Sequence, residues 1–249
     1  MNRPRPQLAV IFELIEQAYG PQKSVEPREA FRLLLHRNCG YPPSETHCGR
    51  GFAALKADIG LQPGEILAAP VISLRKALRA GGIVPELRAE RLREIATRVR
   101  DEFGGDLRKV LRLPLPEARK VLRSFPTISE AGADKIMLFT RAAPVAALPS
   151  NCLHVPVRLG YGRDAKSWSV SYRTAQEAIA AEVAERCEAR MRAYLLLKRL
   201  GHEVCKQSRP LCEHCPVASR CAYYCKLQRA ANCSGAGPRS RRSPSRSGL

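Results

Sequence analysis

Four of the chain's ten cysteines lie close together near the C-terminus, spaced as Cys205-x6-Cys212-x2-Cys215-x5-Cys221. Cysteine thiolates on short loops can bind one metal centre, either an iron–sulfur cluster or a single zinc ion. Zinc sites usually join two short cysteine pairs across a longer gap, and this stretch lacks that form. Three nearby side chains are alternative ligands that we expect to stay outside the metal's coordination: His202, His214 and Cys225. The spacing therefore predicts a metal centre with four cysteine ligands.

The charge balance indicates a polyanionic partner. The 249 residues carry 42 Lys and Arg against 23 Asp and Glu, a formal net charge of +19. This excess is larger than solubility alone requires, so nucleic acid is the leading partner and an anionic membrane surface the second. No run approaches the roughly 18 to 20 consecutive apolar residues that a bilayer span needs. We expect an unsecreted cytoplasmic protein, nucleoid-associated if bacterial.

Apolar residues recur three and four positions apart along most of the chain, which predicts an all-α protein. The 45% hydrophobic content is enough to fill a core and excludes disorder throughout. Ser44 is the predicted N-cap of one helix, and Gly104 and Gly105 close the long helix that begins at Pro85. We expect helices at about 6–19, 44–56, 71–78, 85–103 and 150–159, and one or two helices within 174–200. Three more have less definite ends: one begins at Pro27 and includes Leu35, one includes residues 121–122, and one includes residues 136–138.

Three further stretches can be compared with known motifs: Leu-Leu-Leu-His-Arg-Asn at 33–38, Leu-Arg-Ala-Gly-Gly-Ile at 78–83 and Phe-Pro-Thr-Ile-Ser-Glu-Ala-Gly-Ala at 125–133. Together with the cysteine spacing they resemble the endonuclease III-like helix-hairpin-helix DNA glycosylases, over about residues 6–224. The resemblance implies a base-excision-repair protein that binds double-stranded DNA. It also implies that the four cysteines hold a 4Fe-4S cluster.

The resemblance further implies which residues contact DNA. Asn38 takes the position of a polar side chain that enters the DNA stack beside the flipped base. Thr127 and Ser129 replace the two glycines of the hairpin motif Leu-Pro-Gly-Val-Gly-x-Lys-x-Ala, and their hydroxyls can themselves donate to a phosphate. The remaining candidates for contact with the DNA backbone are Gly132, Lys135, Lys206, Arg209 and Arg220.

The positions that carry the family's chemistry differ in this chain. Ala131 stands where bifunctional members have a lysine that attacks the sugar, which disfavours an AP-lyase mechanism. Pro149 stands where the family has an aspartate that stabilises the cationic sugar or activates water. Asp134 and Lys135 are weak substitutes, and the other nearby acids are Glu130 and Asp164.

Three functions remain open from the sequence. The first is a monofunctional DNA glycosylase that hydrolyses the bond to a damaged or mismatched base flipped into a pocket. The second is a catalytically silent iron–sulfur protein that binds DNA as a lesion sensor, and the third is a zinc-bearing nucleic-acid-binding protein. Four aromatic residues are candidates for stacking on a base: Tyr41, Phe139, Trp168 and Tyr172.

The resemblance predicts two domains. An N-terminal helix within residues 1–26 belongs to the cluster domain, which continues at 143–228 and contains the cysteine loop at 205–221. A six-helix module with the DNA-binding hairpin, residues 27–142, is inserted between them. Residues 229–249 lack an apolar face and carry basic residues without acids, so we expect a disordered basic tail.

Overall fold

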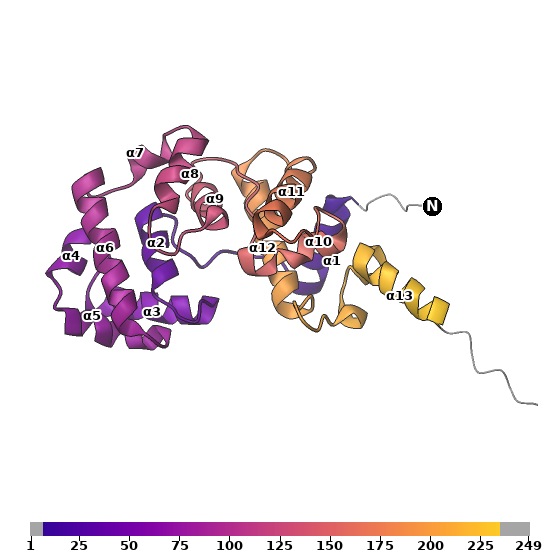
Figure 1. Cartoon of the computed structure of the whole chain (residues 1–249), viewed down its shortest axis with the longest axis horizontal. Coiled ribbons are helices and arrows are strands. Elements are labelled where there is room, and N and C mark those ends of the chain that lie inside the picture. The colour runs from indigo at the N-terminus through magenta and orange to yellow at the C-terminus, as the bar shows by residue number, and fades with distance from the viewer. Residues whose placement is uncertain (1–6, 235–249) are drawn as a thin grey trace, which may run out of the picture.

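The computed structural model describes residues 7–234, and this part of the chain folds into thirteen α-helices with four short 3-10 helices and no strand (Figure 1). The all-α prediction is confirmed. A single isolated bridge joins Tyr41 to Gly82. None of the described helices is long and apolar enough to cross a membrane.

One core is built mainly from the segment that follows the N-terminal helix. Leucines supply much of it, and Leu34, Leu55 and Leu92 are fully buried. The helices that surround this first core are α2 (Ala30–Asn38), α3 (Glu45–Asp58), α4 (Pro63–Ala68), α5 (Val71–Leu78), α6 (Pro85–Phe103), α7 (Arg108–Leu111), α8 (Leu115–Arg123) and α9 (Glu130–Phe139), with the 3-10 helix η1 (Arg79–Gly81).

A second core gathers both ends of the chain. Leu8, Ile11 and Ile15 of α1 (Leu8–Tyr19) pack with residues of the C-terminal half, and α1 lies beside α12 (Figure 1). The other elements are η2 (Ser150–Cys152), α10 (His154–Leu159), α11 (Trp168–Ala180), α12 (Cys187–Glu203), η3 (Cys212–His214), η4 (Ala218–Arg220) and α13 (Ala222–Ser234). The two cores share helices, because Ala131 of α9 packs in the second core while Tyr194 and Met191 of α12 pack in or against the first. The domain boundaries remain predictions.

Most predicted helices are present, with four differences. Ser44 caps α3 by accepting a hydrogen bond from the backbone of His47, and Gly104 closes α6 in the left-handed region, as predicted. The short helices α4 and α7 were not predicted, because each is too short for a periodic pattern. Helix α2 begins at Ala30 rather than Pro27, and residues 150–152 form a 3-10 turn ahead of α10. Helix α13 continues to Ser234, so the expectation of disorder is wrong for residues 229–234; residues 235–249 lie outside the described part.

Arg88 fixes the turn that follows α5. Its side chain is buried at the edge of the first core. It has no acidic hydrogen-bond partner among the described residues. Its guanidinium donates instead to three backbone carbonyls, those of Cys39 at 2.7 Å, Gly82 at 2.8 Å and Ile83 at 3.1 Å. Because hydrogen bonds from a charged donor are stronger than neutral ones, this one side chain joins the end of α2 to the turn.

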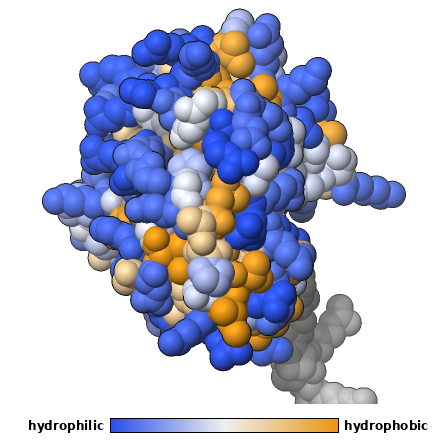
Figure 2. All heavy atoms as spheres, turned by 90° about the vertical axis from the view of Figure 1, so that its left-hand side faces the viewer, coloured by the Kyte–Doolittle hydropathy of each residue, from blue (hydrophilic) through white to orange (hydrophobic). Residues whose placement is uncertain are grey.

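The end of the molecule that carries α4, α5 and α6 has a mostly hydrophilic surface, interrupted by apolar patches (Figure 2). Such a surface matches the large excess of basic residues in the sequence. The exposed apolar side chains of the chain include Ile72 on α5 and Ile83 in the turn that Arg88 holds.

Candidate functional site

The predicted hairpin consists of α8 and α9 joined by residues 124–129. Ser129 is the N-cap of α9 and accepts a hydrogen bond from the backbone N–H of Gly132 at 3.3 Å. Thr127 has a φ of 64°, in the left-handed region that favours glycine. The hairpin therefore keeps the backbone conformation that a glycine would give at position 127, and both hydroxyl side chains are exposed.

Asn38 does not point away from the protein as a wedge would. Its side chain is 2% exposed, its amide nitrogen donates to the carbonyls of Leu34 and Pro126, and its amide oxygen accepts from Thr127 at 3.1 Å. The expectation that Asn38 enters the DNA stack does not hold for this conformation, because every polar atom of the amide group is used inside the protein. Asn38 instead ties the end of α2 to the hairpin.

An exposed apolar turn lies at the end of α5 and was missed as a site. Ile83 is 60% exposed, and the next residue, Val84, has a φ of 51°, which is strained for a β-branched residue. Tyr41, also exposed, is bridged to Gly82 beside it. The sequence signal was the Gly81–Gly82 pair followed by an apolar residue. Apolar side chains presented in this way can wedge between base steps.

The two positions that carry the family's chemistry are buried. Ala131 packs in the second core, and Pro149 lies among buried residues at the start of η2. Asp134, a predicted substitute, is 0% exposed. Its carboxylate accepts from Arg119 at 2.6 Å, from Tyr172 at 2.9 Å and from Gln176 at 2.6 Å. Asp134 therefore works as a structural link. Glu130 lies at the start of α9 and Asp164 on an exposed loop.

A buried cluster of charges lies between the two cores. Lys135 on α9 forms an ion pair with Glu26, which belongs to the segment between α1 and α2. Lys198 on α12 contacts the other oxygen of Glu26 at 3.5 Å and Glu45 of α3 at 3.0 Å. The two lysines keep the pKa of the Glu26 carboxyl below its usual value although burial opposes them, so Glu26 is ionised at neutral pH. Sequence reasoning missed Glu26 because no local motif marks it.

The aromatic candidates divide into buried and exposed pairs. Phe139 is buried against Tyr194, with ring centroids 5.1 Å apart. Tyr172 is buried too, and both burial and the neighbouring Asp134 raise the pKa of its hydroxyl. Trp168 is 40% exposed and stacks on Tyr172 at 5.0 Å between ring centroids. Tyr41 and Trp168 are therefore the two candidates whose rings are open to a base.

The structure brings the four predicted cysteines together. Cys205, Cys212, Cys215 and Cys221 all line one small cavity, with Arg158 and apolar or aromatic side chains around them. Among the described residues, no three His, Cys, Asp or Glu side chains are close enough to hold one metal ion together.

Burial determines the protonation of these thiols. It raises the pKa of Cys215 to about 11 and raises the pKa values of Cys205 and Cys221. Metal ligation requires the thiolate form, and a bound metal supplies the positive charge that stabilises it. The three predicted alternatives, His202, His214 and Cys225, do not line the cavity, which agrees with their expected place outside the coordination. 

Arg158 holds the start of the cysteine loop. Its guanidinium donates to the carbonyls of Lys206 and Gln207 at 2.6 Å and lies 3.6 Å from the sulfur of Cys205. His154 contacts the carbonyl of Cys205 at 2.7 Å from the same helix. Both residues were missed from the sequence. The three predicted phosphate contacts of this region are exposed on or beside the loop: Lys206, Arg209 and Arg220.

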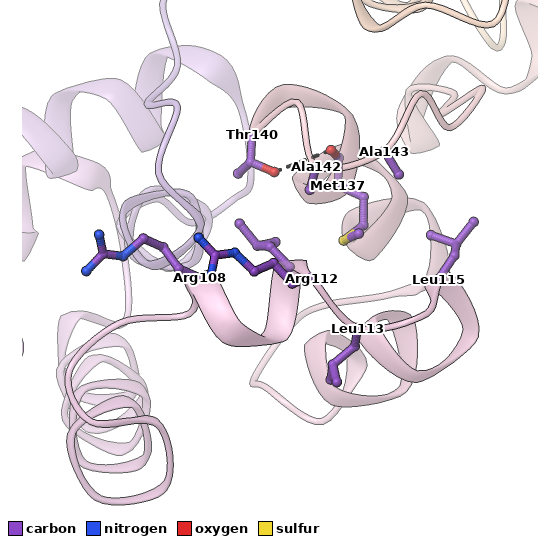
Figure 3. A pocket seen from close by; sticks show the side chains of 9 residues that line it. Arg108, Arg112, Leu113, Leu115, Met137, Thr140, Ala142 and Ala143 are labelled. Atoms are coloured by element: carbon purple, nitrogen blue, oxygen red, sulfur yellow. Dashed lines mark hydrogen bonds between the residues drawn. The ribbon is translucent and has the colours of Figure 1, made fainter.

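Another pocket lies at the C-terminal end of α9, away from the hairpin at its N-terminus. This shallow pocket of about 420 Å³ is lined by Arg108, Arg112, Met137 and Thr140, among others (Figure 3). No predicted site residue lines it. The hairpin, the exposed turn, the charge cluster and the cysteine loop together define the candidate site.

The fold matches solved DNA glycosylases over most of the chain. A non-covalent endonuclease III–DNA complex aligns with a TM-score of 0.70 and 17% identity, covering 92% of this chain and 100% of that chain. A thermostable thymine-DNA glycosylase aligns with a TM-score of 0.63 and 18% identity, covering 88% and 96%. The 3-methyladenine DNA glycosylase MagIII of H. pylori, bound to 1,N6-ethenoadenine, aligns with a TM-score of 0.57 and 12% identity, covering 80% and 98%.

No family model and no curated protein matches the chain. The structural likeness covers nearly all of the chain and all or nearly all of the neighbours. The chain therefore has the helix-hairpin-helix DNA glycosylase fold, and the resemblance seen in the sequence is confirmed at the level of the fold.

The left-handed backbone of Thr127 gives a stability prediction. Thr127→Gly should keep the free energy of unfolding within about 1 kcal/mol of the wild type, because relief of left-handed strain offsets the lost hydrogen bond to Asn38. Thr127→Val keeps the strain and loses the bond, so it should lower the free energy by about 1 to 2 kcal/mol. Urea unfolding measures both. Equal losses for the two variants would show that the φ at position 127 is not strained.

Proposed function

We propose that this protein binds double-stranded DNA and hydrolyses the bond to a flipped damaged or mismatched base, as a monofunctional DNA glycosylase of base-excision repair. The observation that carries the proposal is the match of nearly the whole fold to a DNA-bound endonuclease III. The net charge of +19 supports a polyanionic partner independently.

Each part of the candidate site has a role in this function. The exposed hydroxyl of Ser129 and the N-terminus of α9 contact a phosphate, while the hydroxyl of Thr127 stays bonded to Asn38. Lys206 contacts the DNA backbone from the cysteine loop. Ile83 takes the wedge role that the sequence assigned to Asn38, because its apolar side chain is exposed and the amide of Asn38 is not. The wedge offsets part of the few kcal/mol that flipping costs.

For the cysteine loop we propose a 4Fe-4S cluster held by Cys205, Cys212, Cys215 and Cys221. The support is that all four cysteines line one small cavity. When bound, such a cluster links four points of the loop and gives it a fixed shape. Arg158 places a positive charge beside Cys205, which favours the thiolate that ligation needs.

A second function is favoured by the two replaced catalytic positions. Ala131 provides no amine and Pro149 no carboxylate. A protein that binds DNA through the same surface without releasing a base would act as a lesion sensor.

We expect the affinity for DNA to have two contributions that single substitutions can separate: phosphate contacts, which depend on salt, and the apolar wedge, which does not. Lys206→Ala should reduce the salt slope of the affinity by about 1, because one phosphate contact is lost. Ile83→Ala should weaken binding to duplexes with a mismatched or abasic site while the slope stays unchanged. Fluorescence anisotropy at several salt concentrations measures both quantities. Arg100→Ala, which removes an exposed arginine paired with Asp101, is the matched control and should leave the slope unchanged.

Base release tests the catalytic part of the function. The wild type should release at least one base from duplexes carrying uracil, hypoxanthine, alkylated, oxidised or mismatched bases, without cutting the strand. Pro149→Asp should raise the rate, because it places a carboxylate where the cationic sugar forms. Strand cleavage without alkali would contradict the monofunctional assignment. DNA binding with no release from either protein would establish the sensor role.

The metal content distinguishes the cluster from zinc. The purified protein should contain iron and acid-labile sulfide in equal amounts, about four of each per chain. Cys212→Ala should lose both, whereas Cys225→Ala should retain them, because Cys225 does not line the cavity. One zinc per chain without sulfide would instead identify a zinc-bearing protein.

A further inference from the structure

The charge cluster contains a carboxylate that nothing so far has assigned. The Glu26 side chain is only 6% exposed, and one of its oxygens has no hydrogen bond of good geometry, although its ion pair with Lys135 is close. A carboxylate can accept about four hydrogen bonds. The two lysines therefore leave acceptor sites free, which a water molecule could use.

The position of Glu26 places it near the hairpin. Its partner Lys135 is four residues after Ala131 on α9, so the two lie on the same face of the helix with their Cβ atoms about 5–6 Å apart. The cluster also opens to solvent, since Glu45 is 43% exposed and Lys135 is partly exposed. Because the side chain of Ala131 is itself buried, a substrate approaches the Glu26 carboxylate from the edge of the cluster that Lys135 and Glu45 form.

The other carboxylates near the hairpin are poorer candidates. Asp134 is fully buried, and three donors occupy its two oxygens. Glu130 lies at the start of α9, and Asp164 is on an exposed loop beside the second core. Glu26 alone combines burial, free acceptor capacity and contact with the face of α9 that carries position 131.

We propose that Glu26 is the catalytic carboxylate for base release and that Lys135 is its proton-donating partner. This inference rests on the proposed glycosylase function and assigns the chemistry that Pro149 cannot supply. The carboxylate accepts a proton from a water molecule, and the ammonium of Lys135 donates one to the departing base.

The proposed step balances in atoms and electrons. The bond from C1′ of the sugar to the base nitrogen breaks, and its electron pair stays on the nitrogen, which takes a proton from Lys135. The water oxygen bonds to C1′, and the second water proton moves to Glu26. Glu26 then returns that proton to Lys135, with which it is in contact. The net reaction is hydrolysis to a free base and an abasic site, without a covalent enzyme intermediate.

The test compares Glu26→Gln with Glu16→Gln, which removes a carboxylate of α1 that pairs with Arg192 of α12 outside the charge cluster. Both are assayed for DNA affinity by anisotropy and for base release on the substrate that the wild type processes best. Glu26→Gln should lower the release rate at least about 100-fold, with unchanged DNA affinity. Glu16→Gln should keep both within about twofold of the wild type.

Every outcome of this test decides something. Equal release by wild type and Glu26→Gln overturns the inference and leaves the glycosylase function standing. No release by the wild type, with DNA bound, overturns the inference and the hydrolytic part of the function together. No DNA binding by the wild type overturns the proposed function itself. Equal loss of release in both variants assigns the effect to the loss of any buried or half-buried carboxylate and overturns the role of Glu26.

A second variant covers the case in which Glu26→Gln does not fold. Glu26→Asp keeps the charge but withdraws it by one methylene, so the protein should fold while release falls at least about tenfold, because a misplacement of about 1 Å can cost up to 100-fold. Release equal to the wild type would overturn the inference. Melting curves recorded for each variant separate loss of folding from loss of chemistry.

The pH profile of the wild type gives an independent readout. The ionised form of Glu26 is the active one. Burial raises the pKa of its carboxyl, but Lys135 and Lys198 together lower it by more, so the net pKa lies below the usual value of a glutamate. Release should therefore stay constant from about pH 7 to about pH 5 and fall only in more acidic solution. A rate that falls between pH 7 and 5 would assign the step to a histidine. The charged and titratable groups that face Glu26 are Lys135, Lys198, Tyr194, His36, Glu45 and Cys48.

Discussion

The buried carboxylate of Asp134 joins three helices, and the positions of the other site residues follow from that junction. Arg119 of α8 and the pair Tyr172 and Gln176 of α11 all donate to it. A buried charge is tolerated only when its hydrogen bonds are satisfied, and removing one partner of such a pair costs about 3 to 5 kcal/mol. The junction therefore fixes α9 against both cores. Because α9 is held in place, the hairpin at its N-terminal end and Lys135, about one turn into the helix, are held in place too.

Substitution at the family's catalytic positions is coupled to packing. Ala131 places a methyl group in the second core, and Pro149 is buried at the start of η2. A lysine at 131 would bring a long charged chain to the edge of that core. The charged groups near the hairpin lie instead one helical turn away, where Lys135 and Lys198 pair with Glu26 and Glu45. Positions 131 and 149 therefore carry no charge, and the charged groups of this region gather in a cluster between the two cores.

Local patterns made part of this structure predictable. The cysteine spacing, the N-cap at Ser44 and the hairpin at 125–129 depend on neighbours in sequence, and each was found from the sequence alone. The burial of Asn38 was not, because its partners lie on the hairpin, 88 and 89 residues away. Glu26 was missed for the same reason, since its lysines come from α9 and α12. Long-range pairing of ordinary polar residues leaves no local signal, and the detail of the site rests on such pairs.

Binding and chemistry depend on different parts of the molecule. Phosphate contacts need exposed cations, and Lys206, Arg209 and Arg220 are exposed around the cysteine loop, within a chain whose net charge is +19. The proposed hydrolysis needs a carboxylate that is shielded from bulk water. Glu26 meets this need, because its side chain is buried between the two cores. Exposed charges contribute through a summed field that tolerates single substitutions, whereas a buried carboxylate depends on each neighbour. Single substitutions among the exposed cations therefore change the surface field little, whereas a substitution beside Glu26 acts directly on its charge.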